Sequence, residues 1–428
     1  MYGIYMALTK RYLGFSVLRA AEERVARIFE DFPKVVVGFS AGKDSSVLLH
    51  LVADEARRRG RKFGLLFIDL EAQYQHTIEH AMECFSMYKD VVDPYWVCLP
   101  IKLRNAVSQF QPHWTCWGPE DKALWVRDPP HQAIVESSFF PWFRPRMEFE
   151  EFTEEFGNWY GGGEPTAVLL GIRASESLNR QVTIFNKGKG TWCGLPWTTN
   201  MGSYYNAYPI YDWKTEDVWI YSGKYQKAQN KVYDLMHKAG VPLSKQRLCQ
   251  PYGDSQKQGL WLFQVLEPET WSKVVVRVSG ANFGANYAHK QGLMSGEGKL
   301  KCPPGHTFES FARALLEGMP PESRRHYVGK ITGFLKWWEK KAGFHVQVPI
   351  SDLDIPTADI YETGEERECR ERFPKLRVTK MPTWYRICKT LKTQDWWCTG
   401  LGFTQTSSKN MASYIELVKR RHAAWSMT

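Results

Sequence analysis

A cluster of glycine, lysine, aspartate and serine near the N-terminus has the composition of a phosphate-binding turn. The stretch GFSAGKDSS, from Gly38 to Ser46, follows the short β-branched run Lys34 to Val37 and precedes an apolar pattern with helical spacing. A strand, a tight turn and a helix N-terminus in this order present several backbone N–H groups to one point, where the helix dipole also favours an anion. Gly42 would let the backbone approach phosphate oxygens, and Lys43 would add a positive charge.

The spacing of this turn differs from that of a Walker A loop. A Walker A loop has four residues between its glycines and Ser or Thr directly after its lysine. Here three residues separate Gly38 from Gly42, and Asp44 follows Lys43. Asp44 would repel a triphosphate unless it bound Mg²⁺ or capped the amides of the turn. The alternative is an ordinary strand–helix turn that contains Gly and Lys by coincidence.

Acidic residues follow a second predicted strand, Lys62 to Asp69, which reads KFGLLFID. The helical pattern of Ser45 to Arg59 between the two strands indicates a βαβ crossover and therefore parallel pairing. Asp69 and Glu71 would then lie beside the phosphate turn, at the carboxyl edge where open α/β sheets bind ligands. They would suit Mg²⁺ or polar groups of a nucleotide; the alternative is that they cap the next helix.

Two arginines follow another predicted strand, Thr166 to Gly171, which reads TAVLLG. Arg173 and Arg180 would lie at the same carboxyl edge, where guanidinium groups suit phosphate or sulfate. The alternative is that both arginines are surface residues and bind no anion.

Further patterns complete the predicted fold. Strands are predicted at Tyr95 to Leu99 and Tyr208 to Trp213, with a helix from about Thr215. An aromatic insertion is predicted at about 100–163, because that segment is too long for a simple connection. From Lys227 the patterns are mainly helical, including Met411 to Ala424. We therefore expect an α/β domain at 1–226 and a mainly helical, basic domain at 227–428.

Composition narrows the class of protein. The 428 residues are 43% hydrophobic and 24% charged, as in globular proteins, with no apolar run long enough to span a bilayer. No signal peptide is evident, so a cytoplasmic location is expected. The net charge of +10, concentrated after Lys301, permits nucleic-acid contact but is equally consistent with a solvated surface.

The nine cysteines contain no C-x-x-C pair, so neither a zinc ribbon nor a dithiol redox site is indicated. His113 and Cys116 could be metal ligands, although a packed aromatic loop explains them more simply. Cys249, Cys302 and His306 are a second candidate metal site, although the prolines beside Cys302 indicate a turn.

Four stretches together resemble the PP-loop superfamily, and within it the phosphoadenosine phosphosulfate (PAPS) reductase-like family. They are GFSAGKDSS, FIDLEAQYQHT, LLGIRASESLNR and YPIYDWKTEDVW. The first resembles the PP-loop S-G-G-K-D-S, with Ala41 in place of its first glycine. The resemblance covers about residues 20 to 225. The whole chain looks most like the branch of the immunoglobulin-binding regulator A proteins, a prophage-associated group.

The resemblance implies a five-stranded, mostly parallel sheet of the adenine nucleotide alpha hydrolase type. It also implies cleavage of ATP between its α- and β-phosphates, giving an adenylylated acceptor and pyrophosphate, with Mg²⁺ sharing the charge. The catalytic residues would be Lys43, Asp44 and Arg173, with Asp44 as a Mg²⁺ ligand. The nucleotide-binding residues would be Ser40, Ala41, Gly42, Lys43, Asp44, Ser45, Ser46, Asp69, Glu71, Arg173 and Arg180.

The chain departs from PAPS reductases at its C-terminal end. It lacks their Glu-Cys-Gly-x-His segment, and Cys369, Cys388 and Cys398 have different neighbours. We therefore expect ATP-dependent adenylyl transfer or pyrophosphatase-type chemistry rather than sulfonucleotide reduction. One alternative is a nucleotide-binding regulatory subunit that acts with a ParB/sulfiredoxin-like partner. Another is a sulfurtransferase or sulfonucleotide-binding enzyme that acts on nucleic acid, for which Cys116 and Cys193 are the candidate sulfur carriers.

Overall fold

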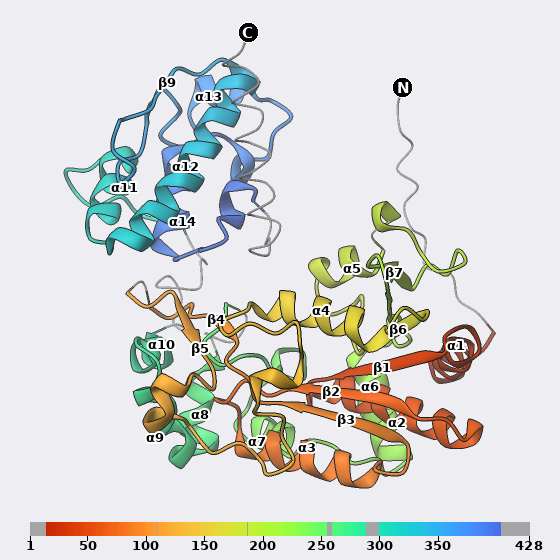
Figure 1. Ribbon diagram of the computed structural model, residues 1–428. Coiled ribbons are helices and arrows are strands. Elements are labelled where there is room, and N and C mark those ends of the chain that lie inside the picture. Colours follow the sequence, from red (N-terminus) through yellow and green to blue (C-terminus); the bar gives the residue numbers. More distant parts are fainter. Residues whose placement is uncertain (1–13, 109, 186, 255–258, 288–298, 404–428) are drawn as a thin grey trace.

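The computed structural model describes residues 14–108, 110–185, 187–254, 259–287 and 299–403 (Figure 1). Its central sheet has six strands in the order β3-β2-β1-β6-β8-β7. All neighbours in this sheet pair in parallel except β7 and β8, so the expected five-stranded parallel arrangement is confirmed, with β7 added antiparallel at one edge. The strands are β1 Lys34–Phe39, β2 Phe63–Ile68, β3 Val92–Val97, β6 Thr166–Leu170, β7 Thr198–Asn200 and β8 Tyr205–Ala207.

Helices cover both faces of this sheet, which explains why its central strands are continuous apolar runs rather than alternating ones. In Figure 1, α2 and α3 lie below the sheet and α4 lies above it. Gly60, in the left-handed conformation, ends α2, where only a residue without Cβ is free of strain. The helices are α1 Val17–Asp31, α2 Lys43–Arg59, α3 Gln75–Met87, α4 Phe149–Gly161, α5 Leu178–Ile184 and α6 Thr215–Lys224.

The prediction of a strand at Tyr208 to Trp213 was wrong. The fifth parallel strand is β8, which ends at Ala207, and the following residues form turns. Tyr208, Ile210 and Trp213 are all buried, so their apolar pattern reflects packing of a turn rather than a strand.

The expected aromatic insertion contains a small hairpin, β4 Lys102–Arg104 paired with β5 His113–Thr115, followed by 3-10 turns and α4. Trp114 and Trp117 are buried in the main core. Within the described residues, no helix is long and apolar enough to cross a membrane.

The remainder of the chain is mainly helical, as expected, and divides between two cores. Helices α7 Val232–Lys238, α8 Trp261–Leu266, α9 Pro268–Arg277 and α10 Ala281–Tyr287 contribute to the core around the sheet. A second core is formed by α11 Phe308–Glu317, α12 Pro321–Ala342 and α14 Trp384–Lys392, with α13 Arg367–Arg372 beside them and the ribbon β9 Val346–Gln347 and β10 Thr357–Ala358. In place of a boundary at 226, we propose one after Tyr287. The predicted helix at Met411 to Ala424 lies outside the described residues.

Candidate functional site

The predicted phosphate turn lies between β1 and α2, at the carboxyl edge of the sheet. Gly42 is the N-cap of α2 and has no side chain with which to bond the first turn of the helix. Ala41 is fully buried and has φ of +54°, a left-handed conformation that favours glycine. This conformation explains why the related motif has glycine at this position. The turn therefore presents the positive end of a 17-residue helix at the sheet edge.

Two positive side chains flank this helix N-terminus, and one carboxylate joins them. The Nζ atom of Lys43 lies 3.2 Å from Oδ2 of Asp44, and Nε of Arg173 donates to Oδ1 of Asp44 at 2.6 Å. Lys43 and Arg173 are 5% and 3% exposed, so both charges are largely removed from water. The sequence analysis assigned Lys43, Asp44 and Arg173 to one site, and in the fold Asp44 contacts both of the other two.

A glycine makes this contact possible. A Cβ at Gly171 would lie 2.9 Å from the backbone carbonyl carbon and oxygen of Asp44 and from Cα of Ser45. The end of β6 therefore approaches the first turn of α2 as closely as the backbone permits, and Arg173, two residues further, reaches Asp44.

The serines of the turn form a local hydrogen-bonded network. Oγ of Ser45 lies 3.0 Å from Oγ of Ser40, and it also donates to the carbonyl of Gly42 at 3.0 Å. Ser46 donates to the same carbonyl and lies 2.8 Å from Nε2 of His80. Burial lowers the pKa of His80 to about 4, so its ring is neutral near pH 7. Ser40 and Ser45 remain at the turn itself, whereas Ser46 is directed into the core.

The expected role of Asp44 as a Mg²⁺ ligand does not fit this arrangement. Both of its oxygens are paired with cationic side chains. Within the described residues, no group of three or more His, Cys, Asp or Glu side chains could bind a metal ion, so Cys249, Cys302 and His306, which the sequence left open as a metal site, do not form one.

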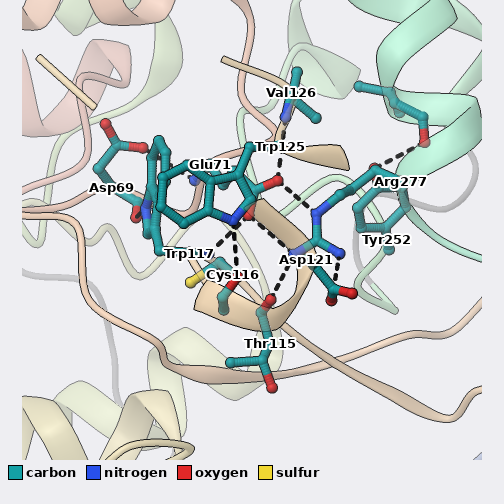
Figure 2. Close-up of polar contacts among 12 residues, drawn as sticks. Asp69, Glu71, Thr115, Cys116, Trp117, Asp121, Trp125, Val126, Tyr252 and Arg277 are labelled. Carbon is teal, nitrogen blue, oxygen red and sulfur yellow. Dashed lines mark hydrogen bonds and ion pairs between the residues drawn. The ribbon is translucent and has the colours of Figure 1, made fainter. Parts of the chain in front are cut away.

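Asp69 and Glu71 follow the carboxyl end of β2, and their carboxylates bond groups of the protein (Figure 2). Both are fully buried. Asp69 accepts from Nε1 of Trp96 at 3.0 Å and pairs with Arg127. Glu71 accepts from the amides of Trp117 and Val126 and from Arg277 at 2.6 and 3.1 Å.

Through these contacts the two acidic residues hold parts of the fold together, which is a structural role. Arg277, in α9, also pairs with Asp121 and donates to the carbonyl of Thr115 (Figure 2). Glu71 therefore joins the strand edge, the aromatic insertion and α9 in one buried network. With every oxygen occupied, neither acidic residue is available to a nucleotide, so we leave both out of the proposed site.

Arg180 lies in α5, with its side chain about half exposed and 3.8 Å from Glu176. It does not contact the turn in this structure. Arg180 and Lys43 both interact electrostatically with the thiol of Cys249.

The other cysteines singled out in the sequence lie away from the turn. Cys116 is fully buried and donates to the carbonyls of Leu99 and Ile101, and burial raises the pKa of its thiol. Cys193 is exposed in the segment before β7. Neither position supports a sulfur carrier at the phosphate turn.

The structure adds a segment that sequence reasoning did not find, residues 230–246, which we call the cover segment. It makes three contacts with the turn. Asn230 donates to the carbonyl of Ala41 at 3.0 Å, the amide of Lys43 donates to the hydroxyl of Tyr233 at 3.1 Å, and Nζ of Lys43 donates to the carbonyl of Gln246 at 3.2 Å. About 190 residues separate these partners in the chain, so no local pattern indicates the contacts.

A cavity of about 520 Å³ lies elsewhere, between α1, α2 and α6. Its walls carry Glu22, Asp54 and Glu55 together with Arg58 and Lys227. Arg58 pairs with Glu55 and Lys227 with Asp54, so the cavity has no excess of positive charge for phosphate groups. The chemistry of the turn, rather than the size of this cavity, identifies the candidate site.

Comparison with known proteins agrees with the first stretch identified in the sequence. Residues 34–95 match the family described as "Phosphoadenosine phosphosulfate reductase domain", and residues 240–412 match "Domain of unknown function (DUF3440)". The chain is 40% identical over 425 residues to "Uncharacterized protein YbdN" of Escherichia coli (strain K12), and the match covers 98% of each chain.

Solved structures with similarity to this chain share little of its sequence. A PAPS reductase from Candida auris in complex with phosphate has 14% identity and a TM-score of 0.29, covering 53% of this chain and 94% of that one. NMN synthetase from Francisella tularensis has 12% identity and a TM-score of 0.27, covering 68% and 100%. NH3-dependent NAD synthetase from Campylobacter jejuni has 11% identity and a TM-score of 0.26, covering 63% and 96%. These values are too low to support a functional argument.

Proposed function

This chain belongs to the family of the Escherichia coli protein YbdN, and we propose that it binds ATP at the turn before α2 and cleaves it between the α- and β-phosphates. One observation carries the proposal: Lys43, Arg173 and the glycine-capped N-terminus of α2 converge at the carboxyl edge of β1 and β6. The match of residues 34–95 to the PAPS reductase domain supports an adenine nucleotide as the ligand.

The proposed reaction transfers an adenylyl group. An oxygen of the acceptor or of water attacks the α-phosphorus, and the bond from that phosphorus to the bridging α,β oxygen breaks. Pyrophosphate leaves with the electron pair, and the proton of the attacking group passes to solvent. The negative charge grows on the departing pyrophosphate, so Lys43, Arg173 and the first amides of α2 would stabilise the transition state. No side chain is required as a covalent nucleophile.

The nucleotide would change the partners of these cations. In the structure, Nζ of Lys43 pairs with Asp44 and donates to the carbonyl of Gln246, which uses two of its three N–H donors. A phosphoryl oxygen carries more charge than a carbonyl, so it would replace Gln246 as the partner of Nζ. Mg²⁺, if required, would be bound mainly by the phosphates, since Mg²⁺ commonly takes substrate phosphates and water as ligands.

The finer expectations remain proposals. The C-terminal cysteines Cys369, Cys388 and Cys398 are all buried, which favours adenylyl transfer over sulfonucleotide reduction. Membership of the immunoglobulin-binding regulator A branch, a ParB-like partner, and sulfur transfer to nucleic acid stay predictions from the sequence.

The test is incubation of the purified protein with ATP labelled in its α-phosphate and with Mg²⁺. Wild-type protein should place the label in AMP or in an adenylylated product. Lys43→Ala should reduce the rate by about a hundred-fold, the usual effect of removing one group that stabilises transition-state charge. Lys62→Ala is the matched control, because Lys62 is 60% exposed and directly precedes β2 at the start of the strand, away from the turn. ATP binding without any product would contradict the proposal.

A further inference from the structure

Tyr233 places a hydroxyl group directly at the N-terminus of α2, although it comes from α7. The amide of Lys43 donates to this hydroxyl at 3.1 Å. A Cβ at Gly42 would lie 3.3 Å from the same oxygen, closer than an ordinary contact. Glycine at the N-cap therefore leaves space for the tyrosine hydroxyl.

The hydrogen of this hydroxyl has no acceptor among the residues that the structure describes. Tyr233 is 3% exposed, and buried tyrosine hydroxyls normally donate a hydrogen bond as well as accept one. Burial, with the charge of Asp44 as a smaller contribution, raises the pKa of Tyr233, so the hydroxyl keeps its proton. The side chain is thus a permanent donor at this position.

A second unpaired group lies on the same segment. Oε1 of Gln246 is buried without a partner, while its Nε2 donates to the carbonyl of Val241 at 2.9 Å, which fixes the orientation of the amide. Gln246 is 1% exposed and contacts Lys43 through its backbone carbonyl. The cover segment therefore carries an unused donor, the hydroxyl hydrogen of Tyr233, and an unused acceptor, Oε1 of Gln246, and a polar ligand at this site would satisfy the donor.

The charges around the tyrosine hydroxyl select the kind of acceptor. Lys43 and Arg173 lie beside the N-terminus of α2, whose dipole adds positive potential. We propose that Tyr233 is a phosphate-binding residue of the nucleotide site and donates its hydroxyl hydrogen to a phosphoryl oxygen bound at the N-terminus of α2. This inference rests on the proposed function and adds a residue from outside the parallel-sheet motifs.

The test measures equilibrium binding of ATP, inorganic pyrophosphate and adenosine to wild-type protein, Tyr233→Phe and Tyr160→Phe. A hydrogen bond to a charged group contributes enough that Tyr233→Phe should raise the Kd of ATP and of pyrophosphate by about ten-fold or more. The Kd of adenosine should not change. Tyr160→Phe is the matched control, because this hydroxyl is bonded to the carbonyl of Val35 at the start of β1, away from the turn.

The outcomes separate the two proposals. Equal or tighter binding of ATP and pyrophosphate by Tyr233→Phe overturns the role of Tyr233 and leaves the proposed function intact. Failure of wild-type protein to bind either ligand overturns both. Tyr233→Met provides a second variant without the hydroxyl, and it should show the same loss of phosphate binding if Tyr233→Phe is poorly folded.

Discussion

Asp44 has an unusual position among the residues of the turn, since it pairs at once with Lys43 and Arg173. In the absence of a nucleotide, this carboxylate offsets part of the positive charge of two buried cations, which would otherwise repel each other. The same carboxylate orients both side chains toward the start of α2. It is therefore better understood as a positioning residue than as a metal ligand.

The buried pair of Glu71 and Arg277 should contribute far more to stability than an exposed pair. We expect Arg277→Met to lower the free energy of unfolding by about 3 to 5 kcal/mol, because it leaves the Glu71 carboxylate buried without its charged partner. Arg367→Met is the control: it breaks a pair with Glu371 in which the arginine is 90% exposed, and should cost less than about 1 kcal/mol. Urea unfolding of both variants measures the difference. Equal losses would show that the network is not a structural centre.

At the scale of elements, the sequence was informative wherever structure depends on neighbouring residues. The valines of β1, the glycines of the turn and the helical pattern of α2 are local signals, and they predicted the strand, the turn and the helix. The pairing of Asp44 with Lys43 was not predicted. The cover segment and Arg277 could not be predicted, because their partners lie about 200 residues away.

The acidic residues after β2 illustrate the same limit. A carboxylate at the end of a parallel strand suits a ligand or a buried arginine equally well. Only the position of α9, which brings Arg277 to Glu71, distinguishes the two roles. The strand predicted at Tyr208 to Trp213 failed for a related reason, since buried aromatic residues in a turn produce an apolar pattern much like that of a strand.

Close approach of β6 to α2 leads to a prediction for Gly171. Gly171→Ala would put a Cβ 2.9 Å from backbone atoms of Asp44 and Ser45, so either β6 or the first turn of α2 must move. We expect a loss of about 1 to 3 kcal/mol in unfolding free energy, together with weaker ATP binding. Gly329→Ala in α12 is the control, because nothing lies within 4 Å of its Cβ and alanine favours a helix. Unchanged ATP affinity in Gly171→Ala would contradict this reading of the site.

At the scale of the whole molecule, the two cores meet at Trp396. Its ring stacks on His326 at 3.7 Å between centroids, and the guanidinium of Arg104, from the β4–β5 hairpin, lies 4.6 Å from the same ring. His113 of the hairpin contacts Trp396 edge-on at 5.3 Å. The aromatic insertion therefore joins the C-terminal helices to the α/β body.

This junction should weaken in mild acid. Burial lowers the pKa of His326 to about 4, with Lys330 and Arg104 lowering it further. Between pH 6.5 and 4 the unfolded chain binds a proton that the folded chain does not, so the free energy of unfolding falls as the pH falls. The loss attributable to His326 should reach about 2 to 3 kcal/mol at pH 4. Unfolding of wild-type protein and His326→Gln at several pH values tests this, and equal pH slopes would contradict it.

The pairing of Glu71 with Arg277 also has a consequence for synthesis on the ribosome. The two residues are 206 positions apart, so at about 5 to 20 residues per second the carboxylate is made about 10 to 40 s before its partner. During that interval the nascent α/β body would have to leave the Glu71 carboxylate hydrated, because its charged partner has not yet been made. Folding of the N-terminal part should therefore be delayed until α9 emerges, and a chain released early would be a target for chaperones.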